Sequence, residues 1–251
     1  VKFLELIFIR SKILIFLIFI GLWELLAFFN DPIILPSPKI VLKTLFIILS
    51  TKDTYIIICN SLSRVAIGLV FSFAIGIPVG MGVALNKGFR AFLVPIIKLL
   101  QSTPIISWIL LALIWLKLWM IPIFILFLNN FPIITINVYE GFLGIDKNLI
   151  EMSNFYKVSI IQKIKHLYIP SIVSNILAST TIILSSSFKI VVMAEVISKI
   201  DVGIGASINY AWINIETEKI LAWTILVIFL GLSIEKMING ILKKKLGRYY
   251  A

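Results

Sequence analysis

The chain has 251 residues, of which 60% are hydrophobic and only 14% charged, and its formal net charge is +11. Soluble globular domains contain roughly 45–50% apolar and 25% charged residues, so this composition excludes a soluble enzyme, a disordered protein and a fibrous protein. A single cysteine excludes an internal disulfide, and with a single histidine it also excludes a zinc site built from Cys and His. The composition predicts an integral membrane protein.

Six stretches are apolar and long enough to cross a bilayer, which needs about 20 residues. In chain order they cover about residues 13–29, 62–85, 92–115, 121–138, 170–197 and 220–234. The first has no small-residue cleavage site before Asn30, so we expect a retained span. No repeat or flexible linker interrupts the chain, and we predict one membrane domain over residues 1–251 with a core over 55–240.

The segments around these spans have features of their own. Residues 39–49 form an amphipathic pattern with lysines on one side, which favours a helix lying at the membrane interface. Prolines interrupt the third and fourth spans. Glycines recur along the second span, where small residues let helices pack closely in a membrane. The glycines are Gly68, Gly76, Gly80 and Gly82, and the prolines are Pro95, Pro104, Pro122 and Pro132.

The distribution of basic residues predicts the orientation. Six spans place both termini on one side, and most lysines and arginines fall on that side, whereas Asp53 and Asp201 fall on the other. Because cytoplasmic loops are enriched in Lys and Arg, both termini are expected in the cytoplasm, and we attribute the positive charge to topology rather than to nucleic-acid binding. Residues 144–168 then form the longest cytoplasmic loop.

This loop is expected to contain two short helices. Asp146 is placed to cap a helix over 149–156, and Ser159 with Gln162 has the spacing of a capping box that would begin a second helix. Such an element offers a docking surface to a soluble partner, since helices commonly dock into grooves. On pattern alone, a loop resting on lipid headgroups is an equally good interpretation.

The order of motifs resembles a known family. The sequence reads Phe131-Pro132-Ile133, then Asn137, Gly141, Asp146, Glu151, and finally Leu167-Tyr168-Ile169-Pro170. This resembles the permease subunits of bacterial ABC importers, whose last large cytoplasmic loop carries a glutamate-led signature ending in I-x-L-P. Further motifs resemble the nitrate, sulfonate and taurine branch: Trp23-Glu24, Leu35-Pro36-Ser37-Pro38, Ser63-Arg64, Gly76-Ile77-Pro78, Gln101, Ala194-Glu195 and Gly203-Ile204-Gly205.

The resemblance implies an all-α type I importer permease fold and a set of partners. Two permeases, a homodimer being the expectation, would each dock a cytosolic ATPase subunit that holds ATP and Mg²⁺, and an external binding protein would deliver a small solute. The sequence contains no G-x-x-x-x-G-K-[ST] phosphate loop, so no cofactor is expected in this chain. The coupling loop would be carried by Asp146, Glu151, Ser153, Lys157, Ser159, Ile169 and Pro170.

Lys157 stands where the family has a glycine that turns the chain. A lysine in a left-handed turn costs roughly 1–2 kcal/mol, so either the strain is tolerated or the turn is built differently.

Charged residues inside spans point to a possible translocation path. Lys189 and Glu195 lie in the fifth span, six residues apart and on different helix faces, so they are not expected to pair. Lys189 facing the path would suit an anionic solute; alternatively it pairs with another span or subunit, for example through Glu140 or Glu24. Ser186 either lines the path or bonds back to its own helix. For Glu195, packing or gating is favoured over solute contact.

Two other functions remain open from the sequence. An ion-gradient-driven secondary transporter usually has ionisable relays or paired broken helices at the midplane, and only Lys189 lies deep here. An intramembrane enzyme needs convergent catalytic groups, for which no cluster is visible. The ABC importer permease is therefore the favoured interpretation.

Overall fold

The computed structural model describes the backbone of residues 2–246. Side chains are described for these residues except 2–13, 174, 175, 177–179, 181, 182, 185, 238, 239 and 241–246. Within this part the chain is built from helices and connecting turns, without a strand, which agrees with the all-α fold that the family resemblance implies. The long helices are α1 (Lys2–Phe28), α3 (Lys52–Leu85), α6 (Ile121–Leu143), α9 (Ile169–Ser198) and α11 (Thr217–Leu246).

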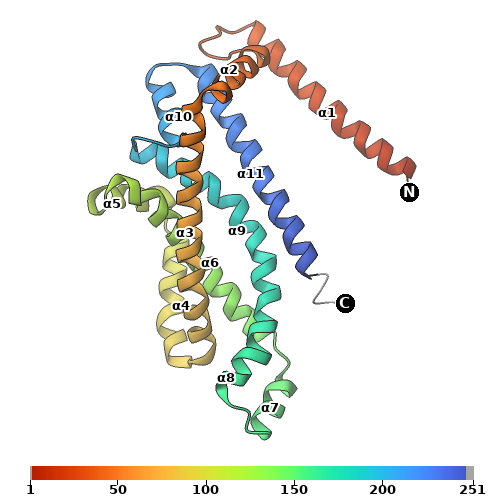
Figure 1. Cartoon of the computed structure of the whole chain (residues 1–251), viewed down its shortest axis with the longest axis vertical. Helices are drawn as coiled ribbons and strands as arrows, with labels where there is room; N and C mark the ends of the chain where they lie inside the picture. The colour runs from red at the N-terminus through yellow and green to blue at the C-terminus, as the bar shows by residue number, and fades with distance from the viewer. Residues whose placement is uncertain (1, 247–251) are drawn as a thin grey trace.

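Shorter helices join the long ones. They are α2 (Pro38–Ser50), α4 (Lys87–Ser102), α5 (Ile105–Trp115), the 3₁₀ turn η1 (Leu118–Met120), α7 (Lys147–Phe155), α8 (Ile160–Lys163), the π turn η2 (Ile164–Tyr168) and α10 (Ile204–Ile213). Figure 1 shows α2 and α10 at one end of the bundle and α7 with α8 at the other. Residues 144–168, which we call the elbow, therefore lie at the end opposite α2 and α10.

Three helices among those with described side chains are apolar and long enough to cross a membrane: α3, residues 118–143 and residues 217–237. The pair α4 and α5 adds a fourth if it is counted as one span. Helices α1 and α9 contain 27 and 30 residues and reach about 40–45 Å at 1.5 Å per residue, although their side chains are described only in part. That the chain crosses the membrane six times remains a prediction.

The third expected span is not a single straight helix. Helices α4 and α5 meet at an angle of 99°, with the break at Thr103 and Pro104. Proline lacks the N–H that would continue the ladder of α4 and restricts the residue before it to extended geometry, and Thr103 is indeed extended with ψ of 129°. By contrast, Pro78, Pro95 and Pro132 are accommodated inside their helices.

The core forms where α3, α6 and α9 pack side by side. Gly80 of α3 shows how close this packing is, since a Cβ atom there would lie 2.7 Å from Cβ of Val138 and 2.8 Å from the backbone oxygen of Thr135. Gly68, Gly76 and Gly80 therefore permit close contact with α6, as the sequence predicts, whereas Gly82 faces the Phe89 ring of α4.

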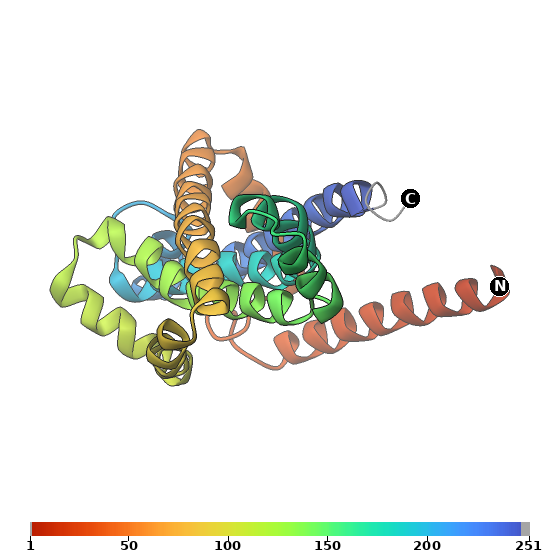
Figure 2. The ribbon, with the colours of Figure 1, turned by 90° about the horizontal axis from the view of Figure 1, so that it is seen from below.

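Helix α1 lies apart from this core. Figures 1 and 2 show that α1 approaches the bundle only near α2 and that its N-terminal end points away from the other helices. The side chains from Leu14 to Phe29 are largely exposed. Its attachment includes a hydrogen bond of 3.1 Å from Trp23 Nε1 to the Pro36 carbonyl. A helix so apolar and so exposed is expected to be covered by lipid or by another protein chain.

Candidate functional sites: the elbow and the Glu195 cluster

The elbow is held to the bundle at its base and exposed at its tip. Ile145 and Tyr168 are buried against α6, and the rings of Tyr168 and Phe142 lie 4.6 Å apart. The first helix begins as expected: the Asp146 carboxylate accepts a hydrogen bond of 2.9 Å from the Asn148 N–H. The base positions the elbow, and the tip is left free for contact.

Lys157 adopts the left-handed conformation with φ of 51°. Its N–H donates to the Asn154 carbonyl, and the Val158 N–H donates to the Ser153 carbonyl. These are the two hydrogen bonds of the Schellman motif that ends a helix, in which glycine usually takes the position of Lys157. Of the two alternatives left by the sequence, the structure has the strained lysine.

Ser159 then caps the start of the second helix, although the Gln162 side chain contacts the Ser159 hydroxyl and not its backbone N–H as in a full capping box. Its hydroxyl accepts from the Gln162 N–H at 3.4 Å and lies 3.2 Å from Gln162 Oε1. This helix is not separate from the fifth span, however: α8, η2 and α9 follow one another without a break. Pro170 cannot donate to the carbonyl four residues earlier, and the preceding turn widens so that the Ile169 N–H bonds to the Ile164 carbonyl. The elbow is thereby continuous with α9.

The tip of the elbow presents apolar side chains and one acid. Glu151 is exposed, whereas Ser153 is buried and its hydroxyl donates a hydrogen bond of 2.7 Å to the Ile150 carbonyl. Ile169 and Pro170, at the start of α9 beyond the elbow, are also exposed. The exposed apolar side chains are Leu149, Met152, Phe155, Tyr156, Ile160 and Ile161. Such a set of exposed apolar residues around a charge is typical of a protein contact surface.

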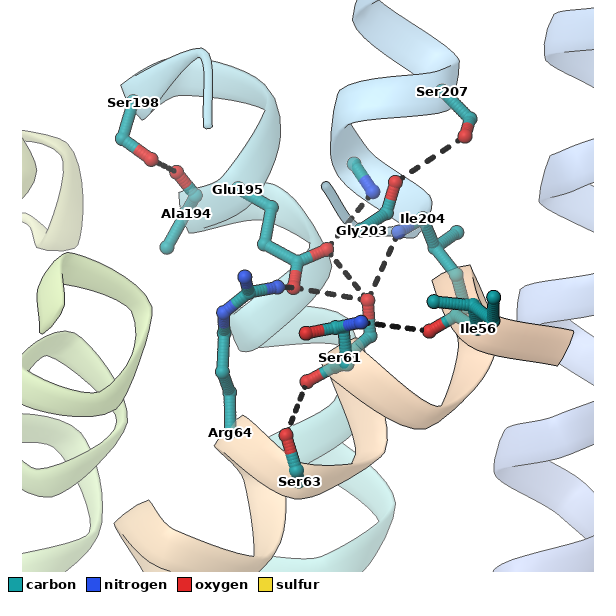
Figure 3. A network of polar contacts seen from close by, with 12 residues as sticks. Ile56, Ser61, Ser63, Arg64, Ala194, Glu195, Ser198, Gly203, Ile204 and Ser207 are labelled. Carbon is teal, nitrogen blue, oxygen red and sulfur yellow. Dashed lines mark hydrogen bonds and ion pairs between the residues drawn. The ribbon is translucent and has the colours of Figure 1, made fainter. Parts of the chain in front are cut away.

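At the opposite end, Glu195 of α9 is completely buried in a polar cluster (Figure 3). Its Oε1 accepts from Arg64 Nη1 at 2.6 Å, and both carboxylate oxygens lie within 2.9 Å of the Ser61 hydroxyl. Its Oε2 also accepts from the Gly205 N–H at 2.9 Å. We call Ser61, Arg64, Glu195 and residues 203–205 the Glu195 cluster.

The glycines of this cluster are required by its geometry. A Cβ atom on Gly205 would lie 2.4 Å from Cβ of Glu195 and 2.6 Å from the Val192 carbonyl oxygen. Gly203 has φ of 155°, a conformation that other residues rarely adopt. The Ser61 hydroxyl accepts a hydrogen bond of 2.9 Å from the Ile204 N–H. The start of α10 is therefore bonded to Ser61 of α3 as well as to Glu195 of α9.

Sequence reasoning missed the partners of Glu195. Arg64 and Ser61 lie more than 130 positions away, and Arg64 was noted only within a motif. The available signal was an arginine inside an apolar span, which demands a counter-charge at the same depth. In this conformation Glu195 contacts protein groups on all its polar atoms.

The other candidate path residues lie on α9. Lys189 is exposed, and among the described residues the ion pairs are Arg64–Glu195 and Lys219–Glu216, so Lys189 pairs with neither Glu140 nor Glu24 within one chain. Ser186 and its neighbour Ser187 both donate to the Ile183 carbonyl, so of the two alternatives for Ser186 the structure shows the bond back to its own helix.

The family described as binding-protein-dependent transport system inner membrane component matches residues 72–246, which include the elbow and the Glu195 end of α9. The chain belongs to this family. It is therefore a membrane-embedded permease subunit of an ABC importer, and the secondary-transporter interpretation is set aside.

Relatives and solved structures agree with this assignment. The chain is 28% identical over 221 residues to a putative ABC transporter permease of Methanocaldococcus jannaschii, covering 86% of this chain and 83% of that protein. It is 27% identical over 236 residues to the nitrate import permease of Synechococcus elongatus, covering 88% and 84%. The fold is similar to a chain of a bacterial ABC transporter involved in alginate import, with a TM-score of 0.68, 18% identity and 96% coverage of both chains. This is the type I importer permease fold.

Proposed function

We infer that this permease is driven by a separate ATPase subunit that docks on the elbow. ATP and Mg²⁺ would bind in that subunit, because the chain has no phosphate-binding loop of its own. The observation that carries this proposal is the exposed tip of the elbow, where Glu151 stands among apolar side chains at the end of the bundle away from α2 and α10.

Continuity between the elbow and α9 supports a mechanical role. A helix passes a rigid-body displacement along its length, and α8, η2 and α9 form one helical run from Ile160 to Ser198. Closure of the ATPase subunits would shift the elbow and thereby the far end of α9, biasing the bundle between two packings.

A second permease copy completes the proposed path. Lys189 is an exposed charge within an apolar helix, and a charge at this depth costs about 2.5–3.5 kcal/mol by insertion scales if it faces lipid. We therefore place Lys189 on a water-filled path shared with a second copy of the chain. Glu195 would act at this path through the packing of its cluster.

The solute is proposed to be a small anion that an extracytoplasmic binding protein delivers. The nitrate relative supports an anion, and the family's dependence on a binding protein supports the partner. With the elbow in the cytoplasm, the α2–α10 end faces that binding protein.

Co-purification tests the coupling proposal. The permease should copurify with its ATPase subunit and, in vesicles with the binding protein, take up solute only with ATP. Glu151→Lys should abolish copurification, whereas the control Asp201→Lys, an exposed acid between α9 and α10, should retain it. Uptake that follows an ion gradient without ATPase, or equal behaviour of the two variants, would overturn the proposal.

Labelling from each side tests the orientation. Cys59 is exposed and would be replaced by serine, and a new cysteine would be placed at the exposed Lys157. A membrane-impermeant thiol reagent should react with Lys157→Cys only in inverted vesicles or broken cells, and reaction in intact cells would contradict the cytoplasmic placement.

A further inference from the structure

A groove of about 490 Å³ lies between the start of α3, the turn from α9 to α10, α10 itself and the first two turns of α11. Figure 1 shows these segments at the end of the bundle opposite the elbow. Exposed carboxylates from two of the segments line the groove, and such groups are costly in contact with lipid, so the groove opens to water. With the elbow in the cytoplasm, a soluble extracytoplasmic protein can reach it.

The charge of this groove suits a cation. Its charged side chains are those of Asp53, Asp201 and Lys219. The Lys219 amine donates 2.7 Å to Glu216 Oε1, so its charge is compensated within the chain. Neither aspartate belongs to an ion pair among the described residues. No set of three or more His, Cys, Asp or Glu side chains that could hold a metal ion occurs in this part of the chain, which argues against a metal as the cation.

The remaining wall suits a guanidinium group. Tyr210 lines the groove and is 65% exposed, so its ring is available for contact. Ile56 and Val202 are also exposed lining residues. A guanidinium group forms paired hydrogen bonds to a carboxylate and stacks on aromatic rings, whereas an ammonium group is more strongly hydrated. The acids and the tyrosine together therefore favour an arginine side chain.

The surface beside the groove is apolar. Trp212, Ile213 and Ile215, on α10 and the turn after it, are each at least 60% exposed. Protein interfaces are enriched in aromatic residues and arginine, and their strongest contacts are anchor side chains that fill a pocket with apolar surroundings. An arginine that belongs to a folded partner fits this surface better than a free cation does.

The segment that lines the groove also closes the Glu195 cluster. Residues 201–203 form one wall of the groove. The next N–H group, that of Ile204, donates 2.9 Å to the Ser61 hydroxyl. The N–H of Gly205 then donates 2.9 Å to Glu195 Oε2, as Figure 3 shows. A partner that displaces this wall therefore acts on the cluster and, through Glu195, on α9.

We propose that the extracytoplasmic binding protein docks on this groove and inserts an arginine side chain, for which Asp53 and Asp201 are the acceptors. The proposal rests on the permease function and names the contact that holds the delivering protein. The docked side chain contacts the segment that closes the Glu195 cluster. Arrival of the binding protein thereby acts on α9, whose helical run continues to the elbow at the other end.

Titration of the binding protein against the permease–ATPase complex in nanodiscs tests the proposal. The probe is the purified binding protein of the same transport system, and surface plasmon resonance measures its Kd. Asp53→Asn and Asp201→Asn should each raise the Kd by about tenfold or more, because a charge pair that docking desolvates loses one partner. Wild-type affinity should also fall as the potassium chloride concentration rises, since salt screens the encounter of opposite charges.

An exchange of charges tests whether the contact is direct. Each exposed arginine of the binding protein is replaced by glutamate in turn. One of these variants should lose affinity for the wild-type permease and regain it with Asp201→Arg, a result that a merely structural role of Asp201 would not produce.

Asp31→Asn is the matched control. Asp31 is an exposed acid in the turn between α1 and α2, at the same end of the molecule, and it does not line the groove. This variant should bind as wild type does. Wild-type affinity in both groove variants, an equal loss in Asp31→Asn, or the absence of any arginine variant that Asp201→Arg rescues would each overturn the proposal.

The outcome is separable from the wider function. Both groove variants should retain the ATPase subunit during purification, because the groove and the elbow lie at opposite ends. Unchanged docking in the two variants would refute the groove alone and leave delivery by a binding protein standing. Failure of the wild-type complex to bind the binding protein would refute delivery and the groove together, whereas failure of the wild-type chain to copurify with an ATPase subunit would refute the coupling proposal.

Discussion

The Glu195 cluster and the elbow are two polar regions at opposite ends of one helical run, and they are built in opposite ways. Glu195 has no exposed surface and every one of its acceptor atoms is used, whereas Glu151, the acid at the tip of the elbow, is exposed among apolar side chains. The first region fastens three elements together, and the second is anchored only at its base. The difference indicates that one end of α9 is fixed by the fold and the other is left for a partner.

Glu195→Gln should have the largest effect on stability. Removing one member of a buried ion pair leaves an uncompensated charge, here that of Arg64, at a cost of about 3–5 kcal/mol. Thermal unfolding in detergent should show it. The control Glu216→Gln breaks the more exposed pair with Lys219 and should cost about 1 kcal/mol or less. Equal losses would mean that the cluster is not the rigid region that we describe.

Gly205→Ala should have the next largest effect on stability. Its Cβ would lie 2.6 Å from a backbone oxygen, which cannot rotate away, and overpacking of this kind costs about 1–3 kcal/mol. Gly231→Ala in α11 is the control, since nothing lies within 4 Å of its added Cβ and the helix should gain up to about 1 kcal/mol. The same unfolding measurement separates the two, and a neutral Gly205→Ala would refute the close approach of α10 to α9.

Lys157→Gly should have a smaller effect of opposite sign. Glycine relieves the backbone strain at φ of 51°, but it also makes the unfolded chain more flexible. We therefore expect the free energy of unfolding to rise by about 1 kcal/mol or less. Lys147→Gly, at the first position of α7, should instead lose up to about 1 kcal/mol. Proteolysis rates at the elbow report both changes. A loss of stability in Lys157→Gly would show that the lysine side chain stabilises the turn.

Phe155→Ser should change stability least. The side chain is 82% exposed, and such surface substitutions usually stay within about 0.5 kcal/mol. Copurification of the ATPase subunit should nevertheless fall, because an apolar contact is removed from the tip. A loss of stability as large as that of Gly205→Ala, with the ATPase subunit retained, would show that Phe155 packs within its own chain.

Much of the local structure was predictable because its causes lie close together in the sequence. The caps at Asp146 and Ser159 depend on side chains two or three residues from the N–H groups that they accept from, and both are confirmed. The break at Pro104 was visible as a proline, but its angle of 99° was not, since the neighbours of both helices set that angle.

The sequence by itself determined a helical membrane protein, its helix caps in the elbow and the family that its signature loop resembles, because composition, periodicity and short-range hydrogen bonds act along the chain. It did not determine which prolines break a helix, since Pro104 does and Pro95 and Pro132 do not. Only the tertiary structure decided which charge Arg64 neutralises, that the second elbow helix continues into α9, and that Asp53, Asp201 and Tyr210 line one groove. Such contacts depend on how helices from distant parts of the chain pack, and a local sequence pattern does not predict which distant residues come together.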